Sequence, residues 1–538
     1  MKQIILNDVV LRDGAQVEGG KMSPKDQLTH VENIIRGGVD VIEIGYPGSS
    51  LEQMEQCKRI VSFVDKLIKS EPKLERPILS ALAMATKKQI DAVKESGCDR
   101  VHIYIPSSDK LLLAQFGKGK YGNTPEEKRQ WAIRQAVKMV KYAKEISIKQ
   151  SQYSPEDAAR AGKEYIRKIS QAVVDAGIDV LNIPETTGLC IGNEFGDLIG
   201  YLMENVAGIK NVVVSVHCHN DSDCATANAI AGILNGALQV EGTFFGLGER
   251  SGMTKLESIV MVVNTRRDRF SNRYVNFDKR LCVKVVNFIA GAIGMSVPRH
   301  WPVVGHQNSI CSSGGHQAIE AQCKASGEES AYYGWNPELY GHKKVNTVIT
   351  ESSGRSGVAD RLKELSIRVS EKQLSEICDK VKKVSEAKGG RGIDEKELTA
   401  VAQEVVANIP YRMEVTDSQV VGGTMPIPNS VIVLRYEEVR ATESSVGDGT
   451  MDAAMKAVHR TAKRIFPILC EADITLDYWR SASVTKGTEA MADSYCRIRV
   501  KYNEVENVFV GTSSHLDTTQ ATAQAYANCL SWFLASLD

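Results

Sequence analysis

The first half of the chain alternates short apolar runs with helical stretches, and this alternation limits the fold more than any other feature of the sequence. Near-continuous apolar strands joined by helical crossovers form parallel sheets covered on both faces, and eight such units fit a closed TIM (β/α)8 barrel. A doubly wound open sheet is the alternative. The eight runs lie at 4–10, 40–47, 78–83, 100–106, 148–154, 180–186, 211–219 and 238–246.

Polar residues at the ends of these runs favour the barrel over the open sheet. Active sites of TIM barrels lie at the carboxyl ends of the strands. The same placement therefore predicts where the site lies. The residues that we expect there are Arg12, Asp13, Ser154, Thr186, His217 and His219.

The rest of the chain indicates further domains, since 538 residues exceed one ordinary core. Mixed helices and polar loops follow the eighth run, and from about Tyr411 alternating segments return beside two helical patterns, which is typical of an α+β domain. We predict an α/β protein with a TIM-barrel catalytic domain at 1–270, helical linker subdomains at 271–408 and a C-terminal α+β regulatory domain at 409–538.

Charge and composition limit the kinds of partner and the cellular compartment that we expect for this protein. Lys plus Arg and Asp plus Glu each number 66, so no net field attracts nucleic acid or an anionic membrane. The first apolar stretch contains Asp8 and the pair Arg12-Asp13, which a secretory signal would not tolerate, and no later run reaches membrane-spanning length. The 12 cysteines show no framework spacing. We expect a soluble cytoplasmic protein with reduced cysteines and a small-molecule substrate.

His217 and His219 lie two apart on one predicted strand, so the pleat turns both imidazoles to the same face. A closed barrel places strands one and seven on either side of strand eight, so Asp13 can complete a metal site that leaves positions open for substrate. A divalent ion there would polarise a 2-oxo acid, and Arg12 could stabilise the developing alkoxide. Hydrogen-bonded core histidines, and Arg12 paired with a carboxylate, are the structural alternatives.

Short motifs along the whole chain resemble the isopropylmalate, homocitrate and citramalate synthase family. The barrel carries LRDGAQ at 11–16, SPEDA at 154–158, NIPETTG at 182–188, HCHND at 217–221 and GLGERSG at 246–252. SGGHQ at 313–317 and ESSGRSG at 351–357 are similar to motifs of its linker subdomains. Three later segments resemble the leucine-sensing domain of isopropylmalate synthases: GDGTMDAAMKAV at 447–458, VTKGTEA at 484–490 and LDTTQATAQAYANCL at 516–530.

The resemblance implies a Claisen condensation of acetyl-CoA with a 2-oxo acid, aided by a divalent cation such as Zn²⁺, Mn²⁺ or Mg²⁺. It implies a homodimer in which residues of one subunit complete the partner's active site. The metal ligands would be Asp13, His217 and His219. The catalytic residues would be Arg12, Glu156, His316 and Tyr332, the last two reaching the partner's site. The substrate-binding residues would be Arg12, Gln16, Ser154, Asn182 and Thr186.

The sequence allows an alternative for the keto-acid substrate, for the amino-acid effector and for the class of enzyme. Met253 follows the GERSG segment where isopropylmalate synthases commonly carry Asn, and this segment also resembles homocitrate synthases. We rank 3-methyl-2-oxobutanoate first, pyruvate second and 2-oxoglutarate third, because the terminal domain is of the leucine-sensing type. Isoleucine is the alternative effector to leucine. A metal-dependent barrel aldolase or lyase, which would need no acetyl-CoA, is the alternative class.

Several of these residues also have a structural interpretation. Ser154-Pro155-Glu156 would suit the start of a helix. Glu249 and Arg250 could form only an ion pair at the barrel mouth, and His316 could be a solvent-exposed residue of a Ser/Gly-rich loop.

Overall fold

Eight parallel strands close into a barrel in the order β1 to β8, and β8 pairs with β1 to complete it. This confirms the predicted TIM barrel. The structure, a computed structural model, describes residues 3–117, 119, 121–311, 313–342, 346–347, 355–364, 367, 369–387, 393, 395–406, 412–422, 427–483, 492–503 and 505–537. Residues 351–354 of the ESSGRSG motif and the VTKGTEA segment lie outside the described residues.

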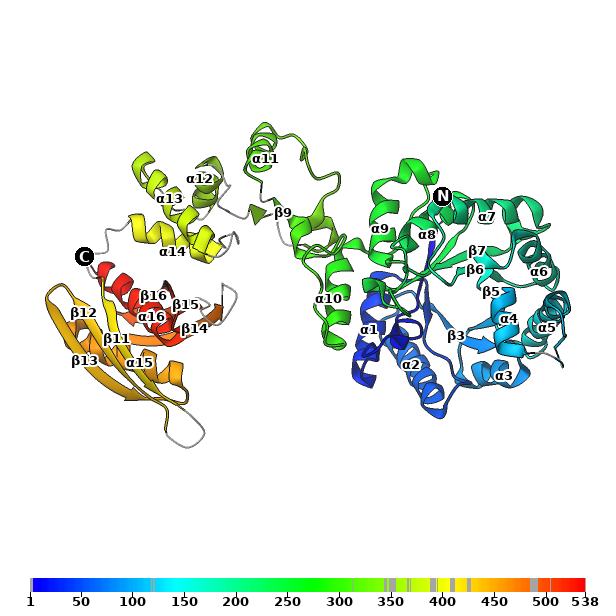
Figure 1. The fold of residues 1–538 in the computed structure, drawn as a ribbon, viewed down its shortest axis with the longest axis horizontal. Coiled ribbons are helices and arrows are strands. Elements are labelled where there is room, and N and C mark those ends of the chain that lie inside the picture. The colour runs from blue at the N-terminus through cyan, green and yellow to red at the C-terminus, as the bar shows by residue number, and fades with distance from the viewer. Residues whose placement is uncertain are drawn as a thin grey trace. The chain divides into compact units, whose positions relative to one another are not determined.

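The barrel strands are short and lie inside a ring of helices (Figure 1). The strands are β1 (Ile5–Asp8), β2 (Val41–Glu43), β3 (Ile78–Met84), β4 (Arg100–Pro106), β5 (Gln150–Glu156), β6 (Val180–Glu185), β7 (Val213–Cys218) and β8 (Gln239–Gly242). The helices of this half are α1 (Pro24–Gly37), α2 (Leu51–Ser70), α3 (Lys87–Ser96), α4 (Asp109–Phe116), α5 (Pro125–Glu145), α6 (Lys163–Asp175), α7 (Gly192–Asn205), α8 (Ala225–Leu234), α9 (Leu256–Thr265) and α10 (Cys282–Ala292).

Local chemistry explains where these helices begin and end. A capping box opens α5: the Thr124 side chain accepts from the backbone N–H of Glu127, whose carboxylate accepts from the backbone N–H of Thr124. Helix α1 starts with Ser23 as its N-cap and Pro24 in its first turn, and it ends at Gly38 with φ 84°. Ser154 and Glu156 belong to strand β5 and begin no helix, because α6 starts only at Lys163.

The chain divides into two compact units, one made of Met1–Ser309 with Trp335–Val345 and the other of Ile310–Gly334 with Asn346–Asp538. The second unit holds β9 (Ile310–Cys311), α11 (Gly314–Ser326), β10 (Asn346–Thr347) and three packed helices, α12 (Arg355–Glu364), α13 (Glu371–Ala387) and α14 (Glu395–Val406). No helix of the described residues has the length and apolar character needed to cross a membrane. All 12 cysteines are free.

The end of the chain repeats one arrangement of three antiparallel strands and a helix. The first repeat is β11 (Glu414–Val421), β12 (Asn429–Tyr436), β13 (Val439–Val446) and α15 (Thr450–Ile465). The second is β14 (Asp473–Ser483), β15 (Ala492–Tyr502), β16 (Val505–His515) and α16 (Thr518–Ala535). Helices α15 and α16 and both sheets share one apolar core, as the predicted α+β fold requires (Figure 1).

Candidate active site

Three potential metal ligands meet at the carboxyl ends of β1 and β7. Strand β1 ends at Asp8, and Asp13 lies in the turn that follows it rather than on the strand itself. His217 is on β7, and His219 comes directly after that strand, where its backbone bridges to Met253. All three side chains are buried. The expected pleat and the closure through β8 together bring them into one group.

The spacing of the three ligand atoms suits a transition metal. His217 Nε2 lies 3.2 Å from His219 Nε2 and 3.7 Å from Asp13 Oδ2, and His219 Nε2 lies 3.9 Å from the same oxygen. The point equidistant from these atoms is about 2.1 Å from each, within the usual range of zinc–nitrogen and zinc–oxygen bonds. Asp13, His217 and His219 therefore lie close enough together to share one divalent cation.

Burial and charge favour the metal-binding forms of His219 and Asp13. Burial, and then the neighbouring His217, lower the pKa of His219 to about 4. Burial would raise the pKa of Asp13, but the positive charge of Arg12 is the largest of the effects that hold it below its ordinary value. A neutral imidazole and an ionised carboxylate are the states that bind metals.

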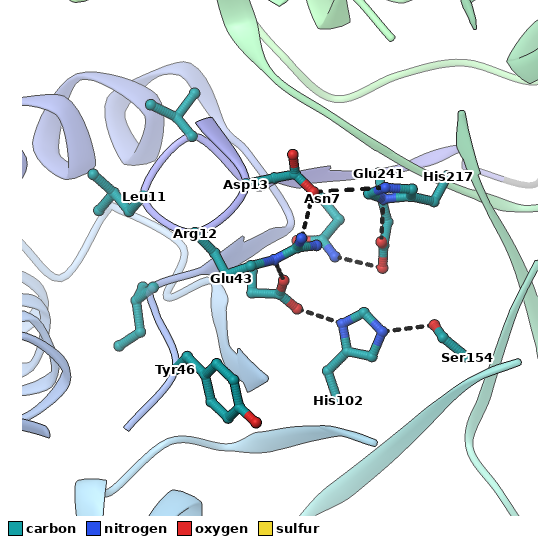
Figure 2. A network of polar contacts seen from close by, with 12 residues as sticks. Asn7, Leu11, Arg12, Asp13, Glu43, Tyr46, His102, Ser154, His217 and Glu241 are labelled. Atoms are coloured by element: carbon teal, nitrogen blue, oxygen red, sulfur yellow. Dashed lines mark hydrogen bonds and ion pairs between the residues drawn. The ribbon is translucent and has the colours of Figure 1, made fainter. Parts of the chain in front are cut away.

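Arg12 and a chain of polar side chains connect this group to the barrel interior (Figure 2). The Arg12 guanidinium bonds the carboxylates of Asp13 and Glu43. Glu43 bonds His102 Nδ1 at 2.5 Å, and His102 Nε2 lies 2.6 Å from Ser154 Oγ. Although burial lowers the pKa of Arg12, Glu43 and Asp13 raise it above its ordinary value, so this cation is permanent.

The predicted substrate-binding residues occupy the same end of the barrel, each on a different element. Asn182 on β6 donates to Ser154 Oγ at 2.8 Å. The hydroxyl of Thr186, directly after β6, accepts from the backbone N–H of Asp157 at 3.0 Å. Burial and then Asp157 raise the pKa of the Glu156 carboxyl, which ends β5. Gln16 is exposed in the short 3-10 helix after Asp13.

Arg250 takes a different partner from the one considered in the sequence. Its guanidinium forms two hydrogen bonds with Asp221, at 2.8 and 3.0 Å, and a third with the carbonyl of Thr186 at 2.6 Å. The pairing with Glu249 is therefore not the main contact of Arg250. Instead, Arg250 ties together the loops that follow β6, β7 and β8.

His316 and Tyr332 lie in the second unit and contact each other. Their rings stack at 3.8 Å with an interplanar angle of 22°. Both residues are exposed, His316 on α11 and Tyr332 in the segment after it. The Glu320 side chain of α11 holds that segment, because it accepts from the backbone N–H of Tyr332 at 2.9 Å and from Ser330 Oγ at 2.8 Å.

Sequence reasoning missed the buried acids and the histidine beneath the metal ligands. Glu43, His102 and Glu241 each interrupt an apolar barrel strand and are fully or almost fully buried. A titratable residue flanked by apolar ones within a strand run was the available signal. This signal could be interpreted only when the topology placed all three residues inside the barrel.

Comparison with known proteins agrees with this architecture along the whole chain. Residues 3–286 match the HMGL-like family, residues 315–389 the homocitrate synthase post-HMGL domain-like family, and residues 392–534 the LeuA allosteric (dimerisation) domain. 2-Isopropylmalate synthase 2, chloroplastic, of Arabidopsis thaliana is 32% identical over 546 residues, covering 98% of this chain and 82% of its own length.

Two further relatives match over almost their full length. 2-Isopropylmalate synthase of Dictyoglomus turgidum is 32% identical over 536 residues, covering 98% of both chains. That of Pyrococcus furiosus is 30% identical over 534 residues, covering 98% of this chain and 99% of its own. The barrel and its site thus define an enzyme of the HMGL-like class. Within that class, the chain belongs to the 2-isopropylmalate synthase family of acyltransferases.

Proposed function

We propose that this protein condenses acetyl-CoA with 3-methyl-2-oxobutanoate to give 2-isopropylmalate, a reaction of leucine biosynthesis. The observation that carries the proposal is the meeting of Asp13, His217 and His219 beside the permanent charge of Arg12. Membership of the 2-isopropylmalate synthase family supports the choice of reaction and of keto acid.

Asp13, His217 and His219 would hold the divalent cation, and two imidazoles favour Zn²⁺ or Mn²⁺ over Mg²⁺. When bound, the cation would supply Lewis acidity that makes the keto carbon of the substrate more electrophilic. Arg12 would add a fixed positive charge for the oxygen that becomes negative during carbon–carbon bond formation. Because Arg12 is already held by Asp13 and Glu43, it needs little reorganisation to do so.

The other predicted residues would bind the keto acid and handle protons. Ser154, Asn182 and Thr186 present hydroxyl and amide groups at the barrel mouth, and Gln16 would close over them. A base removes a methyl proton from acetyl-CoA, the resulting carbanion bonds the keto carbon, the keto oxygen gains a proton, and water cleaves the thioester to release CoA. Glu156 is suited to proton exchange, because burial raises the pKa of its carboxyl.

Charge at the mouth supports a keto acid with an apolar side chain over 2-oxoglutarate. The distal carboxylate of 2-oxoglutarate requires a further cation. Two arginines whose charges act on His219 are already engaged, Arg12 by Asp13 and Glu43, and Arg250 by Asp221. Binding of the distal carboxylate of 2-oxoglutarate to either arginine would compete with these ion pairs.

We also propose that the protein works as a homodimer with leucine as its effector. His316 and Tyr332 would extend into the active site of the partner subunit, where their stacked rings face acetyl-CoA. The match of residues 392–534 to an allosteric dimerisation domain supports both parts of this proposal. Isothermal titration with leucine and with isoleucine tests the effector; absence of heat with both would reject an amino-acid sensor.

The reaction is tested by CoA release, measured with a thiol-reactive dye, from acetyl-CoA, added Mn²⁺ or Zn²⁺ and one keto acid at a time. We expect release with 3-methyl-2-oxobutanoate, little with pyruvate or 2-oxoglutarate, and none in the nearly isosteric variant Asp13→Asn. Asp91→Asn, which changes an aspartate of helix α3 on the outside of the barrel, should behave as the unsubstituted protein. Failure to release CoA with any keto acid would favour the barrel aldolase or lyase.

A further inference from the structure

We propose that Glu241 is a positioning residue that fixes His217 in the tautomer whose Nε2 is free to bind a cation. The inference rests on the metal-dependent function proposed above and adds a residue outside its ligand set. Glu241 lies on β8 and is completely buried, and His217 is its register partner on the adjacent strand β7. Its Oε2 atom is 3.0 Å from His217 Nδ1.

Three amide groups also point at the Glu241 carboxylate. Asn7 Nδ2 donates to Oε1 at 3.2 Å, and Gln152 Nε2 donates to the same oxygen. Asn182 Nδ2 donates to Oε2 at 3.3 Å. The donors come from β1, β5 and β6, so Glu241 contacts strands on both sides of β8 and across the barrel. Figure 2 shows its contacts with Asn7 and His217.

This arrangement decides which nitrogen of His217 carries hydrogen. A carboxylate that accepts from three amides has no proton of its own to donate to an imidazole. The contact to Glu241 is therefore a hydrogen bond donated by His217 Nδ1–H. In the neutral ring the lone pair is then on Nε2, the atom that lies 3.2 Å from His219 Nε2 and 3.7 Å from Asp13 Oδ2.

The second imidazole of the group lacks such support. His219 Nδ1 is buried and has no hydrogen-bond partner among the described residues. The orientation of His219 instead depends on its backbone, which is bridged to Met253. A hydrogen bond from a metal-bound histidine to a carboxylate fixes the ring and makes the ligand more basic. Glu241 would therefore act on His217 alone, and its loss should weaken the site without removing a ligand.

A purely structural role is the competing explanation, because the same carboxylate ties four strands together. Gln239 offers a matched control. It lies two residues earlier on β8, is equally buried, and bonds Arg100, Gln152 and Ser215 but not His217. Gln239→Met should disturb the same strand and the same interior while leaving the His217 bond intact.

The experiment is a titration of the full-length protein with Mn²⁺, followed by calorimetry, and with Co²⁺, followed by its visible d–d absorption. We expect Glu241→Gln to weaken metal binding about 10- to 100-fold and to shift the Co²⁺ bands. Glu241→Asp, which keeps the charge, should recover part of the affinity. Gln239→Met should bind both metals within about twofold of the unsubstituted protein, even where its melting temperature falls, because its ligand support is intact.

The outcomes separate the two proposals. No binding by the unsubstituted protein overturns the metal site and this inference with it. Binding by the unsubstituted protein that Glu241→Gln leaves unchanged overturns only the role of Glu241. An equal loss of affinity in Glu241→Gln and Gln239→Met also overturns it, because the effect would then come from the barrel interior in general.

Discussion

Asp157 follows the predicted catalytic residue Glu156 in a left-handed backbone conformation, with φ 64° and ψ 40°. Glycine adopts these angles freely, and asparagine and aspartate adopt them more readily than the other residues. Its side chain is buried and is held by Ser108 and by Arg160, while its N–H donates to Thr186. Asp157 thus links the ends of β4, β5 and β6, and its backbone sets the positions of Glu156 and Thr186.

We expect Asp157→Ala to lower the free energy of unfolding by about 3 kcal/mol, because it loses buried hydrogen bonds and keeps the backbone strain. The value of kcat/KM should fall about tenfold or more as Thr186 and Glu156 move. Urea unfolding and CoA release measure the two effects.

Asp157→Gly removes the same bonds without the strain, so it should be about 1 kcal/mol more stable than Asp157→Ala. Equal free energies of unfolding for these two variants would contradict backbone strain at position 157.

Glu257 gives the barrel a predictable pH dependence. Burial raises the pKa of this carboxyl to about 7, although Trp301 and the backbone of Phe245 donate hydrogen bonds to it. Because the folded state holds its proton more tightly than the unfolded state, its stabilising contribution is complete below about pH 4 and is lost as pH rises through about 7.

Unfolding of the unsubstituted protein should therefore become easier between about pH 5 and 8, by at most about 3 kcal/mol. Glu257→Gln removes the titrating group. Chemical denaturation at intervals of pH should give a shallower decline for this variant over the same range. Parallel curves for the two proteins would show that Glu257 titrates at its ordinary pKa.

At the scale of elements, the loops after β6, β7 and β8 depend on one guanidinium. The Arg250 side chain is 43% exposed, so its ion pair with Asp221 should contribute less than about 1 kcal/mol to folding. We expect Arg250→Ala to leave the melting temperature nearly unchanged but to raise KM for the keto acid. The reason is that the loop containing Thr186 loses its hydrogen bond to the Arg250 guanidinium.

Two variants sharpen this prediction. Arg250→Lys keeps the charge without the two-pronged geometry and should recover little activity. Arg280→Ala breaks an exposed pair with Asp278 of the same chemical type and should leave KM unchanged. Steady-state kinetics on all three variants test this prediction. An increase in KM for Arg280→Ala equal to that for Arg250→Ala would contradict the role of Arg250 in holding the three loops.

The barrel strands could be predicted because their apolar runs are buried on both faces. The edge strands of the two sheets at the end of the chain could not be predicted. In β11 only Val415 is buried, and a bulge between Val415 and Asp417 interrupts the alternation. A similar irregularity divides β14 between Leu476 and Tyr478. Edge strands with one solvated face and a bulge lack the period of two that a sequence pattern needs.

The candidate site was predictable where residues lie near the end of a strand or in the loop after it. His217 and His219 share one strand end, so their convergence could be derived from the pleat alone. Glu43, His102 and Glu241 contact one another or the ligands through strands that are far apart in sequence. No local pattern says whether an isolated polar residue in a strand faces the barrel interior or the surrounding helices.

At the scale of the whole molecule, the proposed sharing of active sites makes a quantitative prediction. Asp13→Asn and His316→Ala should each be inactive alone. If His316 completes the partner's site, a mixed dimer of the two variants contains one intact site. Equal amounts, unfolded and refolded together, should then recover about a quarter of the unsubstituted specific activity. CoA release before and after mixing measures it. No recovery in verified mixed dimers would place His316 in its own subunit's site, and activity of His316→Ala alone would place it outside catalysis.

The convergence of four donors on Glu241 also affects how the barrel folds. Strand β8 closes the barrel by pairing with β1, which joins residues as distant in sequence as Ile5 and Gln239. When β8 docks, the Glu241 carboxylate must leave water, and its donors on β1, β5, β6 and β7 compensate only if those strands are already in place. We therefore expect closure to be a late and cooperative step of folding, and a fragment that ends before β8 would leave an open sheet whose inward-facing amides and histidine lack their common acceptor.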